Sequence, residues 1–195
     1  MSSPSPPVFL DLEASGLGPD CYPIEVGWAA VNNSGVIVSE AILIRPPEAR
    51  MLRGVWDPLA QQLHGISLDE LRSQGRDPMD VARLMNAALV GRTLYSDSPF
   101  DRMWLQALFE EAHERMDFEI AAKGADTVVV ELADRLGTGD LDYTAAEREA
   151  ARLAPRTHRA AADATYWATL WKLVRDGYRA EPDARPDLGS VRMKP

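Results

Sequence analysis

The stretch Val8-Phe-Leu-Asp11-Leu-Glu13-Ala-Ser-Gly16 decides how the rest of the chain is interpreted. Its first five residues form a short, mostly apolar run that is typical of a buried strand. Successive strand residues point to opposite faces, so Asp11 and Glu13 share one face where the strand ends. Two carboxylates on one face repel each other unless a cation lies between them, and Mg²⁺ is a hard cation that prefers oxygen ligands. The stretch therefore predicts a metal site at a strand end, although Asp117-Phe-Glu119 repeats the spacing.

Two more strands are expected over residues 24–31 and 36–44, separated by a turn at Asn32-Asn-Ser-Gly35. Short connections of this kind favour an antiparallel meander. Helices are expected at residues 57–63, from a capping box at Ser67-Leu-Asp-Glu70, and at 80–89, 100–115, 131–136, 145–153 and 160–174, with a brief strand at 92–96. This order predicts an α/β domain whose mixed β-sheet has three antiparallel strands first and is flanked by helices.

The length of 195 residues suits one compact domain. We expect residues 1–7 to be disordered, residues 8–176 to form the domain, and residues 177–195, rich in Pro, Gly and charge, to form a tail. No apolar run reaches the roughly 18 residues of a membrane span, and the first residues do not resemble a secretory signal. The single cysteine, Cys21, excludes an internal disulfide and favours a cytoplasmic location.

The net charge of −9 argues against nucleic acid as a partner, because phosphates repel an acidic surface. A carboxylate cluster that holds divalent cations reverses the local field, however. The overall charge therefore does not exclude a nucleic-acid substrate.

A second acidic stretch, Tyr95-Ser-Asp97-Ser-Pro-Phe-Asp101, leads into a helix. In one interpretation, Asp101 only complements the positive end of the helix dipole. In the other, Asp101 points into the same cleft as the carboxylates of the first strand. Asp97 is a nearby competitor for that role.

A third stretch, His158-Arg-Ala-Ala-Ala-Asp163, is expected at the start of the last helix. Histidine can accept a proton from water and release it near neutral pH, and Asp163 can ligate a metal. The alanines between them allow another chain or a ligand to approach closely. His64 and Asp69 have the same spacing, but there we expect His64-Gly65 to end a helix and Asp69 to lie in a capping box.

In this order the stretches resemble the DEDDh exonucleases of the proofreading-exonuclease (DnaQ-like) superfamily, whose fold is ribonuclease H-like. Asp11 and Glu13 match the first family motif, Asp101 in Phe-Asp matches the second, and His158 with Asp163 matches the third. Segments similar to Pro23-Ile-Glu-Val-Gly27 and His64-Gly-Ile-Ser67 often occur between the first two motifs of that family. The resemblance covers roughly residues 8–176.

The resemblance implies a metal-dependent 3′-5′ exonuclease that acts on the 3′ end of single-stranded RNA or DNA and releases nucleoside 5′-monophosphates. It implies two Mg²⁺ or Mn²⁺ ions, with Asp11 as the shared ligand and His158 as the base. The implied metal ligands are Asp11, Glu13, Asp101 and Asp163. Ala14 stands where many members have Thr, and Asp97 where many have Asn, which bears on substrate preference.

Residues just after the first motif touch the terminal nucleotide in that family, and here they are Ala14, Ser15 and Leu17. Leu17 either wedges against the last base or packs in the core. Arg156 and Arg159 either meet phosphate or are solvated. Two other functions remain open: a non-catalytic nucleic-acid or nucleotide-binding module on the same fold, and an interaction protein whose acids are only solvated or capping. The exposed faces of the Trp-bearing helices suggest a possible homodimer.

Overall fold

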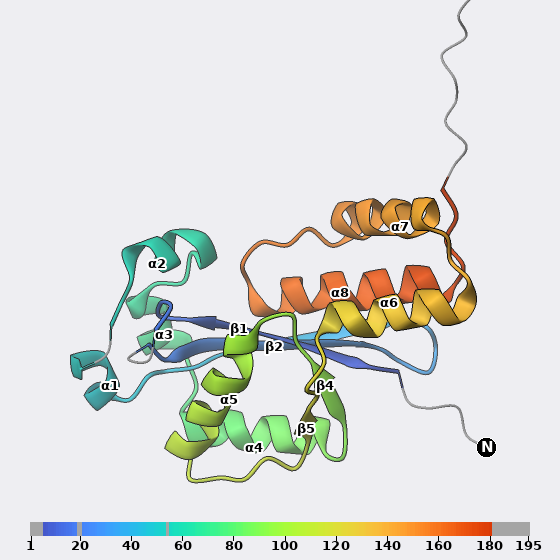
Figure 1. Cartoon of the computed structure of the whole chain (residues 1–195). Helices are drawn as coiled ribbons and strands as arrows, with labels where there is room; N and C mark the ends of the chain where they lie inside the picture. Colours follow the sequence, from blue (N-terminus) through green and yellow to red (C-terminus); the bar gives the residue numbers. More distant parts are fainter. Residues whose placement is uncertain (1–5, 19–20, 54, 181–195) are drawn as a thin grey trace, which may run out of the picture.

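The computed structural model describes residues 6–18, 21–53 and 55–180, which form a five-stranded sheet with helices on both faces (Figure 1). Strands β1 (Val8–Ala14), β2 (Pro23–Val31) and β3 (Ile37–Leu43) are antiparallel neighbours. Strand β4 (Thr93–Tyr95) runs parallel to β1, and β5 (Glu119–Ile120) runs parallel to β4, so the order is β3-β2-β1-β4-β5. This confirms the predicted α/β class and the mixed sheet with three antiparallel strands.

Eight helices occur in the described ranges. They are α1 (Glu48–Arg53), α2 (Pro58–His64), α3 (Leu68–Gln74), α4 (Pro78–Leu89), α5 (Pro99–Glu111), α6 (Ala125–Leu136), α7 (Asp140–Leu153) and α8 (Ala160–Arg175). Helix α8 packs across β1, β2 and β3, with α6 and α7 beside it, whereas α4 and α5 cover the opposite face (Figure 1).

Several predicted boundaries were wrong. Helix α1 and strand β5 were not predicted, and α6 and α7 begin at Ala125 and Asp140 rather than at residues 131 and 145. Helix α5 ends at Glu111 instead of residue 115, because His113 adopts a left-handed φ of 54° just after it. The second Asp-x-Glu copy lies at β5 with both carboxylates exposed, so it is an ordinary solvated surface.

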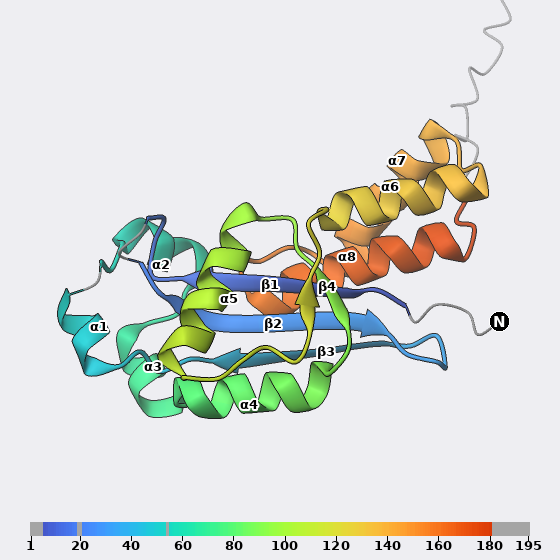
Figure 2. The same cartoon turned by 60° about the horizontal axis from the view of Figure 1, so that its bottom comes forward.

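Successive residues of β1 and β2 point to opposite faces of the sheet, and the face crossed by α5 is in front in Figure 2. Val8, Leu10 and Leu12 belong to the apolar cluster formed with α4 and α5. Phe9 belongs instead to the cluster formed with α6, α7 and α8. Because Asp11 follows Phe9 at a spacing of two, it must face α8 as well, and so must Glu13.

Helix α8 begins in direct contact with the backbone of β2. An ideal Cβ at Gly27 would lie 2.3 Å from the nitrogen of Ala161, closer than real side chains ever come. Gly27 is also the register partner of Asp11 on β1. The alanines after His158 were expected to permit a close approach, and the segment that approaches Ala160 and Ala161 is strand β2 at Gly27.

Both ends of the described chain are held to the domain. The carbonyl of Pro6 accepts a hydrogen bond of 2.7 Å from Arg92. The amide of Ala180 donates to Asp142 on α7 at 2.8 Å, so residues 177–180 pack on the domain rather than extend from it. The remainder of the predicted terminal segments, 1–5 and 181–195, lies outside the described residues. None of the helices described is long and apolar enough to cross a membrane.

Candidate metal centre

Asp11 is the common member of two carboxylate groups at the end of β1. Its oxygen lies within 4.8 Å of oxygens of Glu13 and Asp163, and likewise within 4.8 Å of oxygens of Asp97 and Asp101. Asp11 is almost completely buried and Glu13 is partly buried. The four predicted ligands are thus brought together from β1, α5 and α8, three segments that are far apart in the sequence.

The connection between β4 and α5 supplies Asp97 and Asp101. Because β4 is parallel to β1, the two strands end at the same edge of the sheet. The Ser98 hydroxyl caps α5 by accepting a hydrogen bond of 3.2 Å from the amide of Phe100, which places Asp101 in the first turn. The sequence offered Asp97 as an alternative to Asp101 for the acid near the first strand, and the structure places both with Asp11 in one carboxylate group.

Asp101 fits a cation ligand better than a simple dipole partner. Its side chain is buried, and its Oδ2 accepts a hydrogen bond from the hydroxyl of Ser96. Its Oδ1 is buried and has no hydrogen-bond partner among the described residues. A buried oxygen without a donor is costly, and a divalent cation at the adjoining carboxylates would satisfy it.

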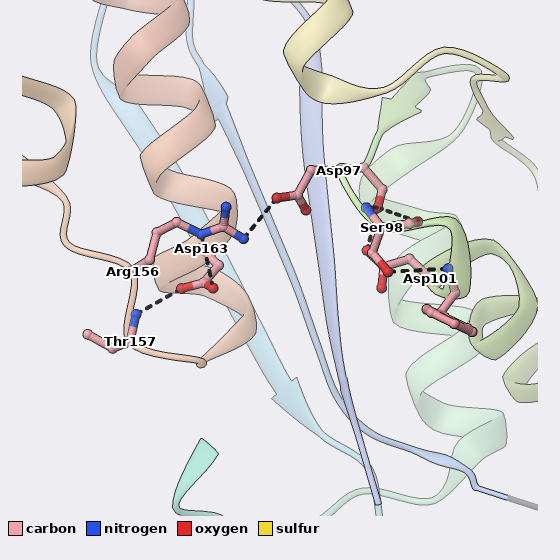
Figure 3. A network of polar contacts seen from close by, with 8 residues as sticks. Asp97, Ser98, Asp101, Arg156, Thr157 and Asp163 are labelled. Carbon is pink, nitrogen blue, oxygen red and sulfur yellow. Dashed lines mark hydrogen bonds and ion pairs between the residues drawn. The ribbon is translucent and has the colours of Figure 1, made fainter. Parts of the chain in front are cut away.

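The loop before α8 holds Asp163. The amide of Thr157 donates to its Oδ1 at 2.9 Å, and Nε of Arg156 approaches its Oδ2 at 3.4 Å (Figure 3). Nη2 of the same arginine pairs with Oδ2 of Asp97 at 2.8 Å. Arg156 therefore bridges one carboxylate from each group, so it is not simply solvated.

Burial raises the pKa of three of these carboxyls, and the neighbouring carboxylates add to the effect. The pKa of Asp11 rises to about 10 through burial and then through the charges of Asp101 and Glu13. The pKa of Glu13 rises to about 8, and that of Asp101 to about 7, where the hydrogen bond from Ser96 opposes the effect of burial. Such a cluster resists ionisation unless positive charge is supplied, which a divalent cation would do.

Glu25 on β2 is a further buried acid whose partner the sequence did not reveal. It is 1% exposed, lies opposite Glu13 in the β1–β2 register, and pairs with Arg159 at 2.6 Å. The signal was present, because a glutamate between Ile24 and Val26 in a buried strand requires a buried partner. Arg159 is consequently the ion-pair partner of a buried carboxylate, although its own side chain remains 42% exposed.

His158 lies in the loop just before α8, as the predicted start of that helix at residue 160 implies. Its side chain is exposed, its φ is 54°, and its imidazole makes no hydrogen bond with any described residue. His64 is different, because it ends α2 with its side chain buried and its Nδ1 accepts from the amide of Ile66 at 3.0 Å. The structural interpretation of the earlier His and Asp pair is confirmed.

The three residues expected to contact the substrate differ in accessibility. Ala14 and Ser15 are buried, and the Ser15 hydroxyl accepts a hydrogen bond of 3.1 Å from the amide of Tyr22. Leu17 is 77% exposed, which rules out the core-packing interpretation. Of the three, only Leu17 presents a side chain to solvent.

No protein-family model and no curated protein matches the sequence. Solved structures of E. coli exonuclease I are similar in fold. The zinc-bound form of its complex with single-stranded DNA gives a TM-score of 0.61 at 18% identity, over 88% of this chain and 40% of that chain. The complex with a dA16 oligonucleotide gives 0.63 at 18% identity, over 88% and 41%. This chain thus spans about two fifths of the length of that protein, and it has the ribonuclease H-like fold that exonuclease I contains.

Proposed function

We propose that this chain is a metal-dependent exonuclease that removes nucleoside 5′-monophosphates from the 3′ end of single-stranded RNA or DNA. The observation that carries the proposal is the convergence of Asp11, Glu13, Asp101 and Asp163, with one buried carboxylate oxygen left without a donor. The fold supports it, because the similar exonuclease I structures were solved with single-stranded DNA.

The two carboxylate groups offer ligands for two cations, Mg²⁺ or Mn²⁺. Asp11 would be shared, Glu13 and Asp163 would complete the first set, and Asp101 would serve the second with Asp97 beside it. When bound, the cations would lower the pKa of a water and stabilise the charge on the leaving 3′ oxygen.

His158 is the proposed base that accepts the proton of the attacking water. Imidazole exchanges protons readily near neutral pH, and this side chain is exposed and forms no hydrogen bond with residues 6–18, 21–53 or 55–180. The adjoining Thr157 donates its amide to Asp163, so the loop that carries His158 is attached to the ligand set itself. Catalytic hydrogen bonds commonly form only when substrate is bound.

Two exposed apolar side chains lie close in sequence to the carboxylates and would offer contacts to a terminal base. Leu17 follows β1, and Phe100, which is 43% exposed and stacked on Trp104, precedes Asp101. Contacts of this kind tolerate any base, because every base has an apolar face. Ala14 and Ser15 would contribute through their backbone, since their side chains are buried.

One gel experiment tests the proposal. Matched single- and double-stranded RNA and DNA oligonucleotides, labelled at the 5′ end, are incubated with Mg²⁺, Mn²⁺ or EDTA. We expect a ladder that shortens from the 3′ end with either metal and not with EDTA. Intact substrate under every condition, together with retained binding of the labelled strand, would instead establish the non-catalytic module.

A further inference from the structure

Helix α8 has no side-chain cap of its own, because its N-cap residue Arg159 makes no capping hydrogen bond. The first turn of a helix leaves backbone N–H groups that need acceptors. Here a distant strand supplies one: Oε2 of Glu25 accepts the amide of Ala160 at 2.9 Å. The start of α8 is therefore capped by β2.

The same carboxylate also fixes the residue before the helix. Nε of Arg159 donates to Oε2 of Glu25 at 3.0 Å, and Nη2 donates to Oε1 at 2.6 Å. Glu25 is 1% exposed, and the two bonds from the partly exposed guanidinium are charge-assisted, which fixes their geometry. Arg159 and Ala160 are thus attached to β2 at three atoms.

The other side of the loop is attached to a different place. Thr157 and Arg156 bond to the carboxylate of Asp163, as described above. His158 lies between the two attachments, and its φ of 54° is a conformation that residues with side chains rarely adopt. Such a conformation persists only where the surroundings hold it, and here the surroundings are Asp163 on one side and Glu25 on the other.

We infer that Glu25 is a positioning residue that holds His158 at the carboxylate cluster by fixing Arg159 and Ala160 to β2. This inference rests on the proposed exonuclease function, in which His158 accepts the proton. Glu25 belongs to neither of the carboxylate groups that could hold a metal ion. If Glu25 only stabilised the fold, its loss would lower activity by the same factor whether position 158 is His or Ala.

The test is a double-mutant cycle. Glu25→Gln keeps the shape of the side chain but removes its charge. It also replaces one carboxylate oxygen, which accepts hydrogen bonds from Arg159 or Ala160, with an amide nitrogen that can only donate. We expect kcat to fall at least about tenfold with KM changed less than about twofold, because a general base contributes about 10²–10⁴-fold to the rate. In the His158→Ala background the same change should cost less than about twofold, because residues that act as a unit are not additive. Equal losses in both backgrounds, or none in either, would overturn the inference.

Matched variants separate positioning from folding. Arg159→Gln should reproduce the effect of Glu25→Gln, whereas Glu114→Gln, which breaks the surface pair with Arg83 at 2.8 Å, should leave kcat unchanged. Mn²⁺ should still raise the melting temperature of each variant, which shows that the ligand set is intact.

Amide hydrogen exchange gives a readout that needs no activity. Exchange at residues 157–160 should accelerate in Glu25→Gln and remain unchanged in Glu114→Gln. If the wild type releases no mononucleotides, the proposed function fails, and faster exchange would still establish that Glu25 holds the loop. Unchanged exchange would overturn the positioning role whatever the activity.

Discussion

The two faces of the central strands carry different kinds of residues. Toward α4 and α5, β1 and β2 present an unbroken apolar surface that includes Leu10 and Trp28. Toward α8, β1 begins apolar at Phe9 and ends in the carboxylates of Asp11 and Glu13, whereas the antiparallel β2 begins with Glu25 and ends apolar at Ala29. Both faces therefore bury apolar residues that stabilise the fold, but only the face toward α8 also holds carboxyl groups whose charged forms are disfavoured by burial.

This difference shows how a single strand serves stability and chemistry together. Alternation separates the two tasks residue by residue, so Leu12 can pack in the core between two acids that face the site. It also implies opposite effects on stability: removing a charge that faces α8 should stabilise the metal-free protein, whereas truncating an apolar side chain on the other face should destabilise it.

The largest effect is expected from Asp11→Asn. Activity should fall by at least about 10³-fold, because metal-based stabilisation of the transition state amounts to several kcal/mol. In EDTA the variant should melt higher than the wild type, because burial disfavours the charged form of Asp11 and raises its pKa to about 10. Melting curves and 3′-end hydrolysis, measured on the same samples, check both expectations. Full activity in this variant would refute the metal centre.

The stability of the metal-free protein should depend on pH through the same residue. The folded pKa of Asp11 is raised from 3.8 to about 10, so the folded state binds its proton more tightly than the unfolded state. Its contribution is fully present below pH 3.8 and is lost as the pH rises to about 10. Urea unfolding in EDTA should show the wild type losing stability relative to Asp11→Asn across that range. Parallel curves for the two proteins would contradict the shift.

The apolar face should respond in the opposite way. Leu10→Ala removes a fully buried side chain from the cluster with α4 and α5, and the free energy of unfolding should fall by about 2–5 kcal/mol. The increase in melting temperature on adding Mn²⁺ should remain, because Leu10 points away from the carboxylates. Loss of the Mn²⁺ effect in a folded Leu10→Ala protein would mean that the two faces are not separate.

A weaker effect is expected from Ser96→Ala. The Ser96 hydroxyl orients Asp101 and lowers its pKa, so its removal should favour the neutral carboxyl. Loss of a residue that orients a metal ligand typically reduces metal affinity by about 10–100-fold. Calorimetric titration with Mn²⁺ measures this, with Ser73→Ala as the control, because Ser73 bonds only to the backbone of α3. Equal affinities in the two variants would argue against the orienting role.

The smallest effect is expected from Leu17→Ala. Because Leu17 is 77% exposed, the free energy of unfolding should not change measurably. KM for an oligonucleotide should rise about fivefold, which corresponds to the lower end of the energy of a base contact. Steady-state kinetics with one RNA and one DNA oligonucleotide measure this change in KM. An unchanged KM for both would show that the base is held elsewhere.

Local patterns predicted much of this fold, because apolar residues recur about every two residues in half-buried strands and every 3.6 residues in amphipathic helices. They failed where the signal was short or absent. Strand β5 has two residues, and α6 begins after Gly124 with no side-chain cap, so neither boundary had a local marker. The β-branched run at Val128 to Val130 also favours a strand until packing against α8 decides for a helix.

The candidate site was predictable as a set of residues but not as a network. Motif order identified Asp11, Glu13, Asp101 and Asp163, whose oxygens do converge. The partners of Arg156 and Glu25 depend on contacts across many residues of sequence, which no local pattern reports. The exposure of His158 likewise depends on how the loop before α8 is attached at both ends.

Gly27 limits how the sequence of this domain can change. Any larger residue there would push back the helix that lies 2.3 Å from its ideal Cβ position, and that helix carries Asp163 in its first turn. A methyl group at this position on β2 would therefore alter the spacing of the carboxylate cluster without touching it. The geometry of the carboxylate cluster thus depends on a residue that has no side chain at all.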